Sequence, residues 1–330
     1  IYYKYTINNS GDIMPRIRVD SQNFPLGTLN NGISYCNFTW SDLIWAAITV
    51  GKRERYDLLR HGRYSIFEMI FRSSLIYSNL KEDGDGNIVR SLVYDGLDPS
   101  EKGAVSYFIG LTIGKLLVEK YLNIPWLMHL DVYRSRIHAD ITGRTRPDLI
   151  GQDINGHWII LEAKGRSRER SETALNQAKF QSQQITEIGG ERCTLNIGLL
   201  SFFNSGILQA EWHDPVQKED SIKLDITKND IIENYYKPFL KVIEEERDRV
   251  QRIEIRNRLF DAIYLEDADI EFGIRTNIRD IMFDYRNDIG NDVQEENNNQ
   301  ITIGSDGVFV RLGPSWSSVN MRVEPQSRST

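Results

Sequence analysis

The fold of this chain is decided by Arg146-Pro147-Asp148-Leu149-Ile150 and, a few residues later, by His157-Trp158-Ile159-Ile160-Leu161-Glu162-Ala163-Lys164. The apolar run Trp158 to Leu161 is typical of a buried strand, and Asn155-Gly156 just before it is a turn signal. We therefore expect a hairpin. Asp148 is expected to close its first strand, and the second strand carries polar side chains at its far end.

Glu162 and Lys164 share one face of that second strand, because side chains two residues apart point the same way, whereas Ala163 points to the other face. Asp148 and Glu162 offer the oxygen ligands that Mg²⁺ or Mn²⁺ prefers, and the main-chain carbonyl of Ala163 could add another. Lys164 could then orient or deprotonate an attacking water, or stabilise negative charge that grows on a phosphoryl group.

Pro147-Asp148 followed by Glu162-Ala163-Lys164 resembles the PD-(D/E)xK signature of the restriction-endonuclease-like nuclease superfamily. The resemblance implies an α/β fold with a core ordered helix, three strands, helix, strand, in which helices flank a mixed central sheet. The predicted elements follow that order, at residues 100–122, 127–137, the strand of Asp148, 158–164, 172–188 and 195–203. The alternative is a chance motif made of a turn and a surface ion pair.

Three further residues are candidates for the same site. Glu101, in the first turn of the first helix, matches the position at which many members of the superfamily hold an additional metal ligand, and compensation of the helix dipole is the alternative. Gln177 and Gln181 lie one turn apart on the second helix and could contact the scissile phosphate or Lys164. A solvated helix face is the alternative for both glutamines.

Basic side chains surround the proposed site in the sequence. A phosphate backbone requires such charges, so we expect these residues to contact nucleic acid. They are Arg144, Arg146, Arg166, Arg168 and Arg170. The alternative is a solvated loop whose charge Glu169 and Glu172 partly neutralise.

The charge of the 330-residue chain is unevenly distributed. The net charge is −7, and Asp261 to Gln300 alone contains eleven acidic residues against three basic ones. This acidic stretch could shield a nuclease from casual contacts, meet a basic partner or simply aid solubility. We predict an N-terminal α+β region at 1–97, a nuclease core at 98–212, an acidic C-terminal α+β region at 213–323 and a disordered tail at 324–330.

Cysteine usage and hydropathy bound the cellular setting. Cys36 and Cys193 have no Cys-x-x-Cys partner, so we expect neither a disulfide framework nor a zinc ribbon, which fits a reducing cytoplasm. No stretch approaches a membrane span, and no signal peptide is visible, so we expect a cytoplasmic protein without membrane contact.

Together the residues and the resemblance predict a metal-dependent endonuclease that hydrolyses phosphodiester bonds, with DNA favoured and RNA as the alternative target. The chain has no P-loop motif, so any energy-coupled step would belong to another protein. We therefore expect an effector in bacterial antiviral defence that depends on a protein partner or on a homo-oligomer. Two alternatives are a stand-alone restriction endonuclease acting as a homodimer and a non-catalytic module that binds nucleic acid or protein.

Overall fold

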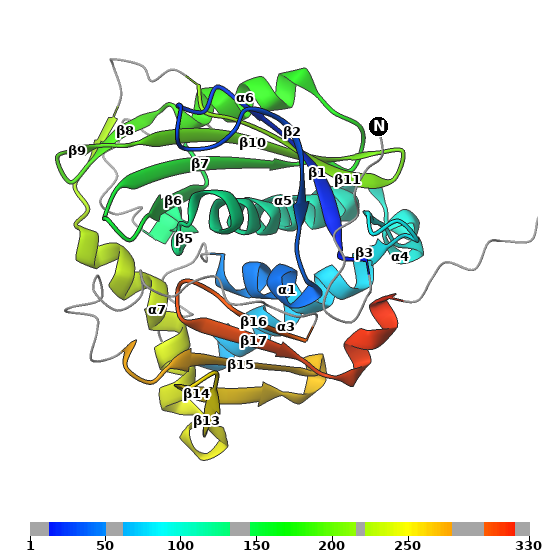
Figure 1. Cartoon of the computed structure of the whole chain (residues 1–330), viewed down its shortest axis with the longest axis vertical. Coiled ribbons are helices and arrows are strands. Elements are labelled where there is room, and N and C mark those ends of the chain that lie inside the picture. Colours follow the sequence, from blue (N-terminus) through cyan, green and yellow to red (C-terminus); the bar gives the residue numbers. More distant parts are fainter. Residues whose placement is uncertain (1–12, 51–61, 133–145, 216–221, 279–299, 321–330) are drawn as a thin grey trace, which may run out of the picture.

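A computed structural model describes residues 13–50, 62–132, 146–215, 222–278 and 300–320. The fold is mixed α/β, and a layer of helices lies between a large mixed sheet and a smaller antiparallel sheet (Figure 1). In that layer α5 packs on the large sheet, and α1 packs on both α5 and the small sheet. No described helix is long and apolar enough to cross a membrane.

The large sheet has nine strands. Its main path runs β2 (Gly32–Asn37), β1 (Arg16–Gln22), β11 (Ile207–His213), β10 (Leu195–Asn204), β7 (Trp158–Gly165), β6 (Leu149–Gln152) and β5 (Trp126–His129). The short strands β3 (Leu80–Glu82) and β4 (Ile88–Arg90) pair with each other, and β4 also pairs with β11. β5, β6 and β7 form an antiparallel meander, whereas β10 is parallel to β7.

Two helices cover opposite faces of β7 and β10. Helix α5 (Pro99–Leu122) lies on one face and α6 (Glu172–Ser182) on the other (Figure 1). Both helices approach the strands most closely at glycines. A Cβ on Gly165 would lie 1.7 Å from the carbonyl oxygen of Ser106 on α5, and a Cβ on Gly198 would lie 2.6 Å from the amide nitrogen of Lys179 on α6. From α5 to β10 the chain therefore forms a helix, three strands, a helix and a strand, with short β8 (Ile185–Ile188) and β9 (Glu191–Arg192) inserted before β10.

Three predicted boundaries are wrong. The first helix begins at Pro99 rather than at 100, because the carboxylate of Asp98 accepts the main-chain N–H groups of Ser100 and Glu101 and caps it. The second helix ends at Ser182 rather than at 188, because residues 185–188 pair with β9 and with β12 (Ile222–Leu224). The strand predicted at 127–137 ends at His129, and residues 133–145 lie outside the described part of the chain.

The C-terminal region contains helix α7 (Lys228–Glu245) and the smaller sheet. That sheet follows the order β13 (Gln251–Ile255), β14 (Arg258–Leu265), β15 (Ile270–Arg275), β17 (Val308–Leu312) and β16 (Ile301–Ile303). Strands β16 and β17 form an antiparallel hairpin. Short 3-10 helices lie at Arg247–Arg249, Glu266–Ala268 and Pro314–Asn320.

The N-terminal region supplies helices α1 (Trp40–Thr49), α3 (Gly62–Asn79) and α4 (Leu92–Gly96), as well as four strands of the large sheet. Strands from both sides of the predicted 97/98 boundary therefore share one sheet. The division into regions 1–97, 98–212 and 213–323 stays a prediction, and the tail predicted to be disordered lies outside the described residues.

Candidate active site at the end of strand β7

The hairpin formed by β6 and β7 brings two carboxylates together. Leu149 lies opposite Leu161, so Asp148 and Glu162 are the next neighbours along the two antiparallel strands. The main-chain N–H of Asp148 donates to Oε2 of Glu162 at 2.8 Å, and the N–H of Ala163 donates to Oδ2 of Asp148 at 3.4 Å. We expected Asp148 to close its strand, but it directly precedes β6. An antiparallel pair joins the start of one strand to the end of the other.

Lys164 completes this cluster. Its Nζ donates to Oε1 of Glu162, the carboxylate oxygen that does not accept from Asp148. The register of β7 on β10 pairs Glu162 with Gly198 and Lys164 with Leu200, which lie on the face covered by α6. The strand alternation predicted for Glu162 and Lys164 is therefore present, and we call Asp148, Glu162 and Lys164 the β7 cluster.

Burial gives the β7 cluster unusual electrostatics. The Glu162 side chain is buried, whereas 29% of the Lys164 side chain is exposed. Burial and the neighbouring charge of Asp148 raise the pKa of Glu162 above its usual range, while Lys164 acts in the opposite direction. A buried glutamate beside a second acid favours its neutral form unless a cation compensates the two negative charges.

The donor set suits a small divalent cation. Asp148 and Glu162 supply carboxylate oxygens, and the carbonyl of Ala163 faces the Asp148 side, because the N–H and C=O of one strand residue point the same way. Mg²⁺ typically takes one or two carboxylates and completes its shell with water and substrate oxygens. Among the described residues, no three His, Cys, Asp or Glu side chains gather in a metal-binding group. A cation here would thus rely on main-chain, water or substrate oxygens.

A second polar network adjoins the β7 cluster at the sheet edge. Arg146, two residues before Asp148, forms an ion pair with the buried side chain of Asp131. The N–H of Asp131 donates to Nδ1 of His129 at 3.2 Å, so the ring hydrogen lies on Nε2, which is 3.3 Å from the hydroxyl of Tyr107. We call Arg146, Asp131, His129 and Tyr107 the edge network.

Sequence reasoning did not find the edge network. Arg146 was a candidate for binding nucleic acid, but nothing near Tyr107 in the sequence indicated its contact with His129. The members of the network come from different elements: Tyr107 lies on α5, Asp131 follows β5, and Arg146 precedes β6. The network also meets α6, since Nε2 of Gln181 donates to the carbonyl oxygen of Arg146 at 3.5 Å. The structure therefore brings Gln181 beside the site.

Glu101 and Gln177 are not drawn into the cluster. The carboxylate of Glu101 accepts the main-chain N–H of Asp98 at 3.0 Å in the helix cap. Ser106, whose carbonyl oxygen approaches Gly165 most closely, lies five residues further along α5, or about 7.5 Å along the helix axis. Gln177 is exposed on α6, one turn before Gln181. These positions match the alternatives of a helix-end charge and a solvated helix face.

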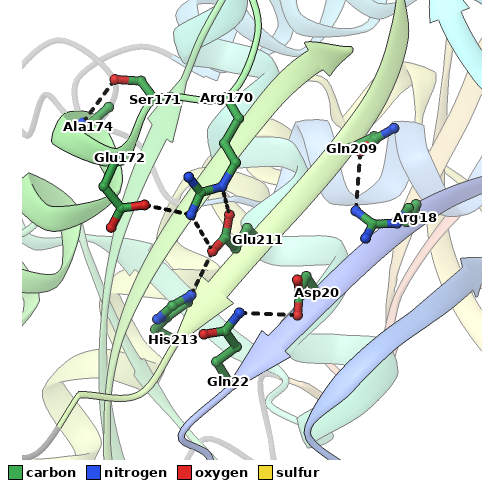
Figure 2. A network of polar contacts seen from close by, with 10 residues as sticks. All are labelled: Arg18, Asp20, Gln22, Arg170, Ser171, Glu172, Ala174, Gln209, Glu211 and His213. Carbon is green, nitrogen blue, oxygen red and sulfur yellow. Dashed lines mark hydrogen bonds and ion pairs between the residues drawn. The ribbon is translucent and has the colours of Figure 1, made fainter.

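The predicted arginines have different environments. Arg168 is exposed, Arg166 is half-buried, and Arg144 lies outside the described residues. Arg170 holds two carboxylates: its guanidinium donates to Glu211, with Nη2 2.9 Å from Oε1, and Nη2 is 2.7 Å from Glu172 (Figure 2). The charge of Arg170 is thus largely compensated inside the protein.

Glu211 is the centre of a polar row on β11 and β1. Nε2 of His213 also lies 2.9 Å from Oε1 of Glu211, and Figure 2 shows both Arg170 and His213 directed at this carboxylate. Burial alone would raise the pKa of Glu211, but the hydrogen bonds and charges of His213 and Arg170 outweigh it and lower the pKa to about 2.

Compared with known proteins, the chain matches no family model, no curated protein and no solved structure.

Proposed function

We propose that this chain is a divalent-metal-dependent nuclease that hydrolyses phosphodiester bonds on a restriction-endonuclease-like core. The observation that carries the proposal is the β7 cluster. Asp148 and Glu162 adjoin each other, and Lys164 donates to Glu162. The run from α5 to β10 also has the element order that the resemblance implies.

The acidic residues would hold the metal. Asp148 and Glu162 would bind Mg²⁺ or Mn²⁺ through their carboxylates, and the Ala163 carbonyl would supply a third oxygen. The bound ion lowers the pKa of water and offsets negative charge on the phosphoryl oxygens. The raised pKa of Glu162 supports this role, because a cation at the site removes the cost of two adjacent buried negative charges.

Lys164 would act on the reacting atoms. Its ammonium group lies on the same face as Glu162 and remains partly exposed, so it can reach a bound phosphate as well as the carboxylate. There it orients the attacking water and stabilises the charge that grows in the transition state. Preorganised charges of this kind need no rearrangement during the reaction, which makes them effective.

The remaining polar residues would bind and orient the nucleic acid. Arg146 is fixed by Asp131 next to the acidic pair, and it would contact a phosphate beside the scissile one. Arg168 is exposed and would add a further backbone contact. DNA is the favoured target and RNA the alternative. A role in bacterial genome defence that depends on a partner or on a homo-oligomer remains part of the proposal.

Cleavage assays test this function directly. Purified protein is incubated with supercoiled plasmid, linear duplex, single-stranded DNA and structured RNA in Mg²⁺, Mn²⁺ or EDTA. Metal-dependent cutting that disappears in Asp148→Asn and Glu162→Gln supports the nuclease. Cutting that survives both substitutions would exclude the β7 cluster as its site. The non-catalytic alternative predicts no cutting and no Asp148-dependent binding of Mn²⁺.

A further inference from the structure

Helix α6 has an exposed face without charged residues. After Glu172 in the first turn, its exposed positions are Thr173, Asn176, Gln177 and Phe180, and the ring of Phe180 is 46% exposed. The outward side of a surface helix usually carries charged residues, because they interact well with water. Here a hydroxyl, two amides and a ring take their place. We call these four residues the α6 outer face.

Helix α6 lies on the same side of the large sheet as the β7 cluster. Glu162 pairs with Gly198 of β10, where a Cβ would lie 2.6 Å from the main-chain nitrogen of Lys179 on α6. Lys164 pairs with Leu200, which also packs under α6. Neighbouring strands are about 4.8 Å apart, so the helix lies within one strand of the proposed metal ligands. Helix α5 lies on the opposite face of the sheet (Figure 1).

One flank of α6 faces the strand that follows Asp148. Nε2 of Gln181 donates to the main-chain carbonyl oxygen of Arg146 at 3.5 Å, and Arg146 precedes Asp148 by two residues. Gln177 lies four residues before Gln181 and therefore one turn along the same flank. Asn176 is rotated about 140° around the helix axis from Gln181. Gln177 is thus the exposed amide of α6 on the side of the candidate active site.

Basic side chains border the α6 outer face. Arg168 is exposed in the loop that joins β7 to α6, Lys179 is half-buried on the helix, and Arg146 lies beside its flank. Residues 173–182 contain no acidic side chain. Duplex DNA has two negatively charged backbones on the sides of a groove, and uncharged base edges form the floor of that groove. A neutral helix face with a basic border complements such a groove.

We propose that the α6 outer face enters the major groove of duplex DNA and that Gln177 reads an adenine near the cleaved bond. This inference rests on the proposed nuclease function and specifies its substrate. The major groove of B-form DNA admits an α-helix, and a glutamine amide accepts from N6 of adenine and donates to its N7. Phe180 contacts the methyl group of a thymine. The major groove of an RNA helix is too narrow for such readout, so the substrate is DNA.

The residue types of the α6 outer face favour DNA over a protein partner. Protein interfaces depend on a few large anchors, chiefly aromatic residues and arginine, that fill pockets of the partner. The α6 outer face has one ring among three uncharged polar side chains. Hydrogen-bonding groups without charge, beside an apolar group for the thymine methyl, match what base edges offer.

Selection from a randomised duplex tests base readout without any cleavage. The full chain binds a library of DNA duplexes in EDTA, and sequencing of the bound fraction gives the base preference at each position. Fluorescence anisotropy with a labelled duplex and a labelled RNA hairpin gives the affinities. The variants are Gln177→Ala and Phe180→Ala, and Gln251→Ala is the matched control because it removes an exposed amide from β13. Arg168→Ala represents a phosphate contact, and the unfolding midpoint shows whether each variant folds.

Wild type and Gln251→Ala should enrich A·T pairs at the same positions. Gln177→Ala should lose roughly 5- to 150-fold of discrimination at one position, while its affinity for the unselected duplex and the salt dependence stay nearly unchanged. Phe180→Ala should lose part of the preference for thymine. Arg168→Ala should instead weaken binding to all sequences and lower the salt slope by about one.

Three results would overturn the proposal. The first is a wild type without base preference, and the second is an unchanged preference in Gln177→Ala. The third is a uniform loss of affinity in Gln177→Ala for all duplexes or for the RNA hairpin, because such a loss indicates a backbone contact.

The failure of this inference differs from a failure of the proposed function. If cutting depends on Asp148 but the base preference ignores Gln177, the nuclease stands and α6 does not read its substrate. If the base preference depends on Gln177 but cutting never appears, the readout stands and the nuclease assignment fails.

Discussion

Two clusters of lysine and carboxylate among the described residues differ in their access to solvent. The β7 cluster lies at the end of a strand with Lys164 partly exposed. The second cluster joins Lys115 of α5 to Asp306 at the tip of the β16–β17 hairpin, where both residues are fully buried. The same residue types therefore serve different purposes, according to what surrounds them.

The buried cluster is saturated with hydrogen bonds. The Asp306 carboxylate accepts from Nε1 of Trp45 at 3.2 Å, from the Tyr235 hydroxyl at 2.6 Å and from the Val308 N–H at 3.0 Å. Burial raises the pKa of Asp306 to about 6, although the charge of Lys115 opposes this shift. Burial likewise lowers the pKa of Lys115. Every contact is internal, so this cluster fastens the small sheet to the helix layer.

The β7 cluster has an open side. Two carboxylates adjoin one lysine, and the lysine tip reaches solvent. A substrate phosphate or a metal ion can enter such a cluster, whereas nothing can enter around Asp306. The two clusters therefore differ chiefly in the open side at Lys164, since a second acid, Glu119, also acts on Lys115 and Asp306. Substitutions in the buried cluster should therefore mainly lower stability, and substitutions in the β7 cluster should mainly lower the rate of cleavage.

The largest effect on stability is expected from Asp306→Ala. The change removes the acceptor of Trp45 and Tyr235 and leaves the buried Lys115 with Glu119 as the remaining opposing charge. Loss of one partner from such a cluster costs about 3–5 kcal/mol in the free energy of unfolding. Urea denaturation measures this value. Asp306→Asn combined with Lys115→Met is the control and should recover part of the loss, because it removes both charges together.

Lys164→Ala should give the opposite result. We expect the cleavage rate to fall roughly 10²- to 10³-fold, since a preorganised charge beside the reacting phosphate is lost. The free energy of unfolding should change by less than about 1 kcal/mol, because the lysine is partly exposed. Single-turnover cleavage and urea denaturation of one preparation give both numbers. A variant that cuts at the normal rate would remove Lys164 from the reaction.

Gly165→Ala should affect both properties. The added Cβ would meet the carbonyl oxygen of Ser106 at 1.7 Å, so α5 has to move away from the strand that carries Lys164. We expect a loss of about 1–3 kcal/mol in stability together with slower cleavage. Gly103→Ala is a matched control on α5, because its Cβ meets no atom within 4 Å, and it should stabilise the helix by about 0.5–1 kcal/mol.

The smallest effect concerns pH and Glu211. The pKa of Glu211 is about 2 in the folded protein and 4.5 as its ordinary value, so its contribution to stability is present above pH 4.5 and is lost as the pH falls toward 2. We expect Glu211 to contribute roughly 1–2 kcal/mol to the free energy of unfolding, since its partner Arg170 is partly exposed. Urea denaturation of the wild type and of Glu211→Gln across this range tests it. The variant should show a flatter slope, and equal slopes would contradict the assignment.

Local patterns predicted the elements around the β7 cluster well. The apolar run from Trp158 formed β7, and strand alternation placed Glu162 beside Lys164. The position of Asp148 in its strand was wrong, although its partner was right. Local sequence patterns indicate which residues are buried, and the antiparallel pairing of two neighbouring strands then determines which residues lie opposite each other.

Contacts between distant segments could not be predicted in this way. Lys115 and Asp306 are separated by more than half of the chain, and nothing near either residue in the sequence indicates the other. Tyr107 and His129 meet only because α5 crosses beside the edge strand β5. The start of the first helix was predicted one residue late, because its range does not show that the Asp98 carboxylate accepts the N–H groups of Ser100 and Glu101.

The proposed function requires that the β7 cluster cuts nucleic acid. Its most direct test is single-turnover cleavage in Mg²⁺ of an unpaired strand and a duplex by the wild type and by Asp148→Asn, with the unfolding free energy of both proteins measured in parallel. We predict metal-dependent cutting that Asp148→Asn abolishes while stability is nearly unchanged. Equal cutting by the two proteins would contradict the proposed function.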